Sequence, residues 1–200
     1  MTQKRRMIIG ISGATGVIYG VRLLQVLKQM GIETHLVVTK AGEMTRAYET
    51  DLSAQQLRSL ADVWYPVMDV GAAISSGSFK TMGMIVAPCS VRTMSEIAHG
   101  LTSNLLTRAA DVTLKERRRL VLLLRETPLT INHIRSMLAV TESGGIIAPP
   151  VPAFYIRPQT IEEIVDHTIG RVLDLFEIEM AGMERWGEHS PRFPASGVEE

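Results

Sequence analysis

Apolar and polar segments alternate along this chain in a pattern that predicts a parallel α/β fold. Short apolar runs rich in Ile, Val and Leu have the length of buried strands, and the longer segments of mixed polarity between them have helical character. Strands that alternate with helices form βαβ units, so we expect one doubly wound parallel sheet. The predicted strands are residues 7–11, 34–39, 82–88, 120–124 and 145–149, and the predicted helices are residues 17–30, 41–60, a segment opened by Ser90, 104–115, 130–140 and 161–176.

A turn of glycines and hydroxyl residues links the first strand to the first helix. It reads Gly10-Ile11-Ser12-Gly13-Ala14-Thr15-Gly16. Glycines let a ligand approach the backbone, and free N–H groups at a helix start favour an anion such as phosphate. The spacing is not G-x-G-x-x-G, and no Gly-Lys-Ser/Thr follows, so neither common phosphate motif is present. The turn predicts a phosphate-bearing cofactor of unspecified type, and tight strand–helix packing accounts for its glycines equally well.

Composition narrows the class of protein. The chain has 200 residues, 46% of them hydrophobic, which suits one domain with a buried sheet. Its 21 basic and 21 acidic residues balance, so no overall field attracts nucleic acid or an anionic membrane. The apolar run after Lys4-Arg5-Arg6 is short and broken by glycine, so we interpret it as a strand rather than a signal peptide, and no run reaches membrane-spanning length.

Cysteine and histidine usage points to a reducing compartment and to chemistry without a protein-bound metal. Cys89 is the single cysteine, which excludes an internal disulfide and favours a cytoplasmic location. We expect it to be a buried thiol at a strand end rather than a nucleophile. The five histidines are scattered, with no pair at metal-ligand spacing.

Residues that handle phosphate or a polar ring follow each predicted strand. The carboxyl ends of parallel strands meet at one edge of a sheet, so these residues are expected to share a rim. A hydroxyl at a helix start is also a common N-cap, and that alternative covers Thr39 and Ser90. In chain order the rim residues are Gly13, Ala14 and Thr15; Thr39 and Lys40; Cys89, Ser90, Val91, Arg92 and Thr93; Arg125 and Glu126; and residues 149–155.

Three further segments carry possible chemistry. The hydroxyl-rich loop 75–78 is a ligand loop or a polar turn. The basic run 115–119 suits a solvated helix end whose cations complement the helix dipole, and a small phosphate substrate would need one or two of them. Phe154, Tyr155 and Arg157 follow a stiff proline-rich stretch and suit a ligand with an apolar tail and a phosphate.

Taken together, these motifs are similar to those of the UbiX-type flavin prenyltransferases. The match runs in order from about residue 7 to residue 187, so it covers nearly the whole chain. The matching segments are residues 10–16 (Gly-Ile-Ser-Gly-Ala-Thr-Gly), 75–78 (Ser-Ser-Gly-Ser), 88–90 (Pro-Cys-Ser), 106–112, 114–118 (Leu-Lys-Glu-Arg-Arg), 125–128 (Arg-Glu-Thr-Pro), 152–155 (Pro-Ala-Phe-Tyr) and Arg185-Trp186.

The resemblance implies a Rossmann-like, flavodoxin-type single domain over residues 1–187, with residues 188–200 as a flexible tail. It implies metal-independent transfer of a dimethylallyl group from dimethylallyl phosphate to reduced FMN, which closes a ring across N5 and C6. The prenylated FMN would pass to a UbiD-type decarboxylase. The family forms large homo-oligomers with sites at subunit interfaces, so a dodecamer is expected.

The resemblance also implies roles for individual residues. Phosphate is the leaving group, so Lys115 and Arg171 would neutralise its charge, while Tyr155 or Trp186 would face the allyl cation. Either Glu126 or the departing phosphate would accept the proton. The implied flavin-binding residues are Gly13, Ala14, Thr15, Thr39, Ser90, Val91, Arg92, Thr93 and Arg125; those for dimethylallyl phosphate are Lys115, Tyr155, Arg171, Arg108 and Trp186; the catalytic ones are Glu49, Glu126, Lys115 and Tyr155.

Some positions depart from the family pattern, and three rival functions would each require different residues. Thr15 and Thr39 stand where many members have serine, and Ile156 where many have histidine. A cysteine decarboxylase of the phosphopantothenoylcysteine type would carry Pro-Ala-Ser-Ala-Asn-Thr at residues 88–93, and an NAD-binding protein would carry an acid after the second strand; neither is present. A non-catalytic FMN carrier would need the flavin loops but not Lys115, Glu126, Tyr155 and Arg171 together.

Overall fold

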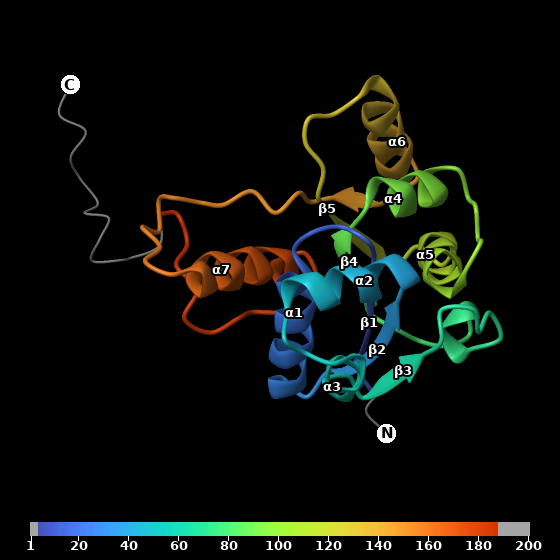
Figure 1. Ribbon diagram of the computed structural model, residues 1–200, viewed down its shortest axis with the longest axis horizontal. Helices are drawn as coiled ribbons and strands as arrows, with labels where there is room; N and C mark the ends of the chain where they lie inside the picture. Colours follow the sequence, from blue (N-terminus) through green and yellow to red (C-terminus); the bar gives the residue numbers. More distant parts are fainter. Residues whose placement is uncertain (1–3, 188–200) are drawn as a thin grey trace. The chain divides into compact units, whose positions relative to one another are not determined.

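Six parallel strands form a sheet in the order β3-β2-β1-β4-β5-β6 (Figure 1). The computed structural model describes residues 4–187, which separate into two units that divide after Pro150. The sheet belongs to the first unit, and its order is that of a doubly wound Rossmann-like fold, so the predicted fold class is confirmed. The strands are β1 Arg6–Ile11, β2 Glu33–Val38, β3 Val63–Tyr65, β4 Gly83–Cys89, β5 Arg119–Leu124 and β6 Ile146–Ile147.

Helices connect the strands, and side chains cap most of them. Thr39, Ser90 and Thr130 are among the N-caps whose hydroxyl accepts a backbone N–H of the first turn. The helices of the first unit are α1 Val17–Gln29, α2 Lys40–Glu49, α3 Ala54–Ser59, the 3₁₀ turn η1 Ala73–Ser75, α4 Val91–Ala98, α5 Leu105–Lys115 and α6 Ile131–Glu142, and the second unit contains α7 Ile161–Asp174. None of the helices in the described part of the chain is long and apolar enough to cross a bilayer.

The core of the first unit lies on both faces of the sheet. All seven residues of β4 are buried, as are five of the six in β1, β2 and β5. One face, with Met84 and Leu122, packs against α4, α5 and α6. The other face contacts α1, where a Cβ on Gly20 would lie 2.8 Å from Ile11 Cδ1. Strands covered on both sides expose side chains only at their ends.

Three predicted elements differ from the observed ones. The predicted helix 41–60 is two helices, because Thr50 is extended and Ser53 starts α3 with a capping box to Gln56. β3 was not predicted; it has three residues and lies at the sheet edge. The predicted strand 145–149 is reduced to the two residues of β6. Prolines follow at 149 and 150, and proline lacks the N–H that extends a ladder. The tail 188–200 lies outside the described residues, and the domain bounds remain a prediction.

A buried histidine links β2 to the edge strand β3. His35 on β2 is 2% exposed; its Nδ1 lies 2.9 Å from the Tyr65 hydroxyl and its Nε2 lies 3.0 Å from Glu33 Oε1. Hydrogen bonds from Lys4 and Arg6 hold the pKa of Glu33 at about 2. Burial lowers the pKa of His35, so the ring is neutral in the folded protein and accepts from Tyr65 while donating to Glu33.

We predict that this histidine makes the protein less stable as the pH falls below about 6.5. Below that pH the unfolded chain binds a proton at His35, whereas the folded chain, in which the pKa of His35 is lower, does not. The contribution of neutral His35 to the free energy of unfolding is therefore complete only above the pKa that His35 has in the unfolded chain. Urea unfolding midpoints at pH 7.5 and 5.5, at equal protein concentration, should differ less in His35→Gln than in the wild type. His167 titrates in the same direction but is present in both proteins. Equal pH differences would contradict the prediction.

Candidate functional site

The strand order reverses between β1 and β4, which are neighbours in the sheet. The chain leaves β1 for α1 on one face and leaves β4 for α4 on the other, so the two loops diverge. In doubly wound sheets, ligands bind outside the carboxyl ends of the strands at such a point. The predicted rim residues after β1, β2, β4 and β5 therefore share this edge, as the sequence predicts.

Ser12 ties the two central strands together at this edge. Its side chain is fully buried, its Oγ accepts from Ser90 N–H at 2.8 Å, and it donates to the carbonyl of Pro88 at 3.1 Å. The neighbouring strand ends are joined by Thr39 N–H to Ile11 O (2.9 Å) and Arg125 N–H to Cys89 O (3.0 Å). Ser12 is not among the predicted site residues. A hydroxyl residue directly after a buried strand nevertheless indicates a polar contact at the rim.

Thr39 and Ser90 both serve as helix caps. Thr39 Oγ1 accepts from Gly42 N–H at 3.0 Å and caps α2, and Ser90 Oγ accepts from Thr93 N–H at 3.3 Å and caps α4. The capping alternative is therefore correct for both, and each cap holds its side chain at the rim. Thr93 is buried behind Ser90, whereas Thr15, Arg92 and Arg125 are exposed.

Two N–H groups at the start of α1 are bonded within the chain. Glu49, the last residue of α2, accepts from Gly16 N–H (2.9 Å) and Val17 N–H (3.0 Å) through Oε2. A carboxylate of the protein thus occupies the place where the sequence predicts free N–H groups facing a phosphate, and that expectation is wrong for these two groups. Gly13 also has a packing role, because a Cβ there would collide with Ala41.

A pocket of about 360 Å³ opens beside this turn. Thr15, Glu49 and Thr50 contribute its polar groups, and Ile18, Val21 and Leu52 contribute apolar walls. Hydroxyls, guanidinium groups and the start of α4 supply donors along the same edge, which is a donor set suited to a phosphate and to the carbonyl oxygens of a flavin. The residues present therefore fit an FMN-type ligand.

Lys115 lies at the amino ends of the strands, at the end of the sheet opposite to the rim. It is the last residue of α5, and β5 begins four residues later at Arg119. Its Nζ lies against Gly77, in the segment that precedes β4, since a Cβ on Gly77 would be 2.9 Å from that nitrogen. A six-residue strand spans about 20 Å, so one copy of the chain does not bring Lys115 to the rim. Arg108, on the first turn of α5, pairs with Asp111 at 2.8 Å.

The second unit groups three of the predicted residues around α7. The Tyr155 hydroxyl lies 3.0 Å from His167 Nε2, and the Tyr155 ring meets Trp186 edge-on at 5.4 Å. Arg171 donates to Asp174 at 2.7 Å. His167, Arg171 and Asp174 recur at helical spacing and so share one face of α7.

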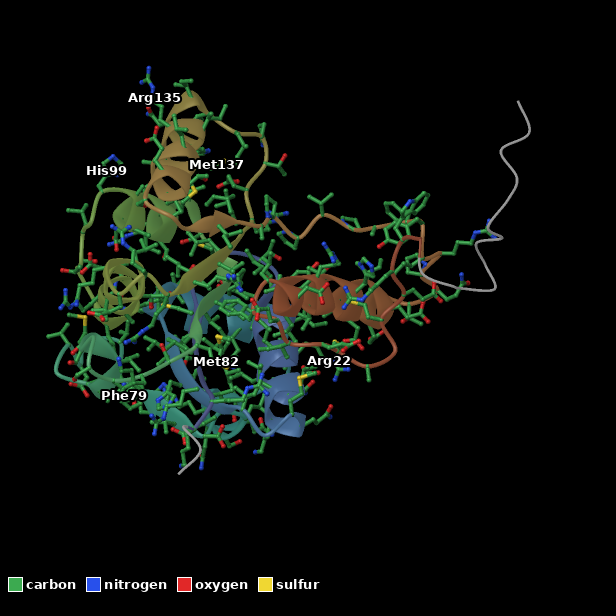
Figure 2. The ribbon with its side chains drawn as sticks, turned by 180° about the vertical axis from the view of Figure 1, so that it is seen from behind. Arg22, Phe79, Met82, His99, Arg135 and Met137 are labelled. Carbon is green, nitrogen blue, oxygen red and sulfur yellow. The ribbon has the colours of Figure 1, made fainter. Side chains whose placement is uncertain are left out.

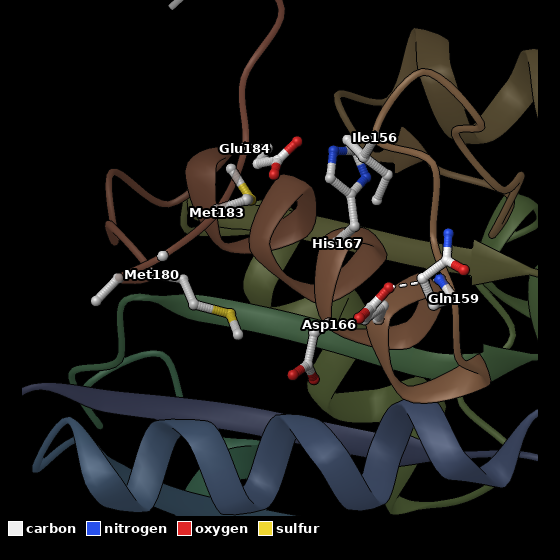
Figure 3. Close-up of a pocket in the computed structure, with 10 residues that line it drawn as sticks. Ile156, Gln159, Asp166, His167, Met180, Met183 and Glu184 are labelled. Atoms are coloured by element: carbon white, nitrogen blue, oxygen red, sulfur yellow. Dashed lines mark hydrogen bonds between the residues drawn. The ribbon is translucent and has the colours of Figure 1, made fainter. Parts of the chain in front are cut away.

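His167 is a residue that the sequence reasoning missed. It is 8% exposed and lines a pocket of about 290 Å³ between α7 and residues 180–184 (Figure 3). Burial lowers the pKa of His167, so the neutral ring can share a hydrogen bond with the Tyr155 hydroxyl. The spacing of four residues between His167 and Arg171 in a predicted helix indicates that both side chains lie on the same face.

Comparison with known proteins identifies the family. A family model described as "Flavoprotein" matches residues 1–178. The flavin prenyltransferase UbiX of Neisseria meningitidis serogroup B is 54% identical over 182 residues, which are 91% of this chain and 96% of that protein. The chain belongs to the UbiX flavin prenyltransferase family.

Two solved structures support the assignment to the UbiX family. The structure of AnUbiX (PadA1) in complex with FMN and dimethylallyl pyrophosphate has a TM-score of 0.92 and 47% identity, covering 94% of this chain and all of that one. A dodecameric FMN-dependent UbiX-like decarboxylase from Escherichia coli O157:H7 has a TM-score of 0.88 and 48% identity, covering 90% of this chain and 98% of that one. The resemblance inferred from the motifs is therefore confirmed.

We predict that Ser12 supports flavin binding in this UbiX-family rim. Ser12→Ala leaves the Ser90 N–H without its acceptor, which costs roughly 1–3 kcal/mol of folding free energy and loosens the start of α4. Urea unfolding should register the loss, and titration with FMN followed by flavin fluorescence should show weaker binding. Thr45→Ala is the control, because that hydroxyl bonds its own helix at Ala41 O. FMN affinity equal to that of the wild type would contradict the role assigned to Ser12.

Proposed function

We propose that the chain transfers the dimethylallyl group of dimethylallyl phosphate to reduced FMN, across N5 and C6. The observation that carries this proposal is the 54% identity to a flavin prenyltransferase over 91% of the chain, together with the presence of Lys115, Glu126, Tyr155 and Arg171. The prenylated FMN would serve a UbiD-type decarboxylase. The single cysteine supports the proposal of a cytoplasmic location.

The rim residues would hold the flavin. Reduced FMN, when bound, supplies the nitrogen and carbon that accept the prenyl group. The hydroxyls of Thr15, Thr39 and Ser90 and the N–H groups at the start of α4 would donate to its polar atoms, with Arg125 adding positive charge. Gly13, Ala14, Val91, Arg92 and Thr93 complete the proposed flavin-binding set.

Cationic side chains would stabilise the departing phosphate. Lys115 and Arg171, with Arg108 nearby in the proposed assembly, would neutralise the charge that grows as the C–O bond breaks, so the proposal requires no metal. Within residues 4–187, His, Cys, Asp and Glu side chains do not gather in threes as a metal site. Tyr155 and Trp186 meet edge-on, and either ring could offer its face to an allyl cation.

Two carboxylates are candidates for work beside the reacting centre. Glu126 is half-buried, and its Oε1 accepts from Thr127 N–H at 3.0 Å, which orients the group at the rim. It or the departing phosphate would take the proton. Glu49 would place its carboxylate beside the reacting centre while its Oε2 accepts from two backbone N–H groups at the start of α1.

The proposed site requires more than one copy of the chain. Lys115 and the rim occupy opposite edges of the sheet, so a site that contains both draws them from two subunits. A closed homo-oligomer provides such pairing at every site. The dodecameric state of the Escherichia coli O157:H7 structure is the state we propose.

The decisive test of the activity is prenylation of the flavin itself. The purified protein, incubated anaerobically with reduced FMN and dimethylallyl phosphate, should yield a flavin heavier by one prenyl unit in the mass spectrum. Flavin that stays bound but unchanged would support the alternative of a non-catalytic FMN carrier. Omitting dimethylallyl phosphate is the control, because the same flavin should then keep its mass.

Mixed oligomers test whether each site is shared. Lys115→Ala and Arg125→Ala should each lose most transferase activity, since they remove one contribution to the same site. Unfolding the two variants together and refolding them should restore part of the activity, because some sites then combine an intact Lys115 with an intact Arg125 from another copy. Each variant refolded alone is the control. An inactive mixture of correctly assembled oligomers would show that both residues come from one copy.

A further inference from the structure

The basic run 115–119 does not form a uniform solvated helix end. Arg117 is exposed, as that interpretation predicts, but the Arg118 side chain is only 13% exposed and turns inward. Its Nη1 donates to Phe79 O at 2.7 Å and its Nη2 donates to Gly77 O at 2.6 Å. One guanidinium therefore joins two carbonyls of the segment Ser76–Phe79, which we call the serine loop.

The end of α5 explains why neighbouring arginines point in different directions. Arg117 has a φ of 56°, and the N–H groups of Arg117 and Arg118 bond back to Leu114 O and Thr113 O, both at 2.9 Å. This is a Schellman motif, in which the left-handed residue reverses the chain after the helix. The reversal directs Arg118 toward the serine loop and leaves Arg117 in solvent.

The serine loop is fixed at a second point by Phe79. The Phe79 ring meets His35 edge-on at 5.0 Å, and Arg6 Cζ lies 4.7 Å from its centroid. Figure 2 labels Phe79 in the first unit. The 3₁₀ turn η1, which comes just before the loop, packs on α5. Phe79 thus anchors one end of the loop to the sheet, while Arg118 holds its carbonyls.

Lys115 rests directly on this loop. A Cβ on Gly77 would lie 2.9 Å from Lys115 Nζ and closer still to Glu116 Oε1, so a side chain there would displace the ends of both. Lys115 Nζ pairs with Glu116 Oε1 at 2.5 Å, and this bond keeps the pKa of Glu116 below its ordinary value. The hydroxyls of Ser76 and Ser78 flank the same glycine and lie 2.9 Å apart.

We propose that Arg118 is a positioning residue for dimethylallyl phosphate, which acts by fixing the serine loop against which Lys115 is held. The inference rests on the proposed function, in which Lys115 binds the phosphate. A lysine side chain is flexible, and a fixed wall reduces the freedom it loses on binding. The planar guanidinium can bond two carbonyls at fixed separation, whereas a lysine ammonium cannot reproduce that fork.

Arg118→Lys and Arg118→Gln should raise the KM for dimethylallyl phosphate, by roughly tenfold in the glutamine variant and less in the lysine variant. The FMN dissociation constant should stay unchanged, because the residues that Arg118 contacts (Gly77, Phe79 and Glu116) lie outside the proposed flavin-binding set, and kcat at saturating dimethylallyl phosphate should change little. Arg117→Gln is the matched control, with the same loss of charge at an exposed neighbour. An equal effect of Arg117→Gln would assign the result to charge and overturn the proposal.

A second variant reaches the same contact without touching Arg118. Gly77→Ala introduces a Cβ where Lys115 and Glu116 now lie, and it should raise the KM in the same way while leaving both Arg118 bonds possible. Thermal unfolding midpoints monitor the fold of every variant. An unchanged KM in folded Arg118 and Gly77 variants would overturn the positioning role. A lower kcat together with weaker FMN binding, at an unchanged KM, would also overturn it.

Calorimetry with the complete oligomer separates this inference from the proposed function. With FMN kept oxidised so that no transfer takes place, binding of dimethylallyl phosphate should weaken in the Arg118 variants and not in Arg117→Gln. Wild-type protein that binds dimethylallyl phosphate but never prenylates reduced FMN would refute the proposed function while the Arg118 comparison still stands. Equal binding by the wild type and Arg118→Gln would refute the inference alone.

Discussion

The burial of whole strands is the constraint on which the arrangement of this protein depends. β4 buries seven consecutive residues, and its neighbours β1 and β5 each bury five of their six residues. A parallel sheet enclosed in this way has no side of a strand on which a polar group can meet solvent. Chemistry is therefore confined to the two edges where strands begin and end. The hydroxyl and guanidinium donors lie at one edge, and Lys115 with the serine loop lies at the other.

This separation has a consequence for assembly. Residues at opposite ends of a six-residue strand cannot meet in one subunit, so a site that uses both must be formed between subunits. The proposed flavin rim is stabilised by Ser12 and two helix caps, whereas Lys115 pairs with Glu116 and lies against Gly77. The two halves of the proposed site therefore rest on different sets of contacts, so a substitution in one half removes no contact of the other.

The sequence predicts well those features that depend on neighbours along the chain. Contiguous apolar runs locate the long strands, and hydroxyls at helix starts locate the caps at Thr39 and Ser90. It predicts poorly the features whose partners are distant. Ser12 bonds residues 76 to 78 positions away, and Arg118 bonds carbonyls 39 and 41 positions away. β3 escapes prediction because three residues at an edge depend on contacts such as Tyr65 with His35.

The run Lys115-Glu116-Arg117-Arg118 shows how backbone geometry divides residues that composition treats as one patch. The left-handed conformation of Arg117 ends the helix, and an arginine tolerates it at a cost that glycine would avoid. Lys115 before the reversal faces the serine loop from the helix, and Arg118 after it bonds the same loop from the position just before β5. A single turn thus places two cations beside Gly77. Lys115 would bind the phosphate, and Arg118 holds the serine loop against which Lys115 lies. The physical role of each charge follows from its position relative to that turn.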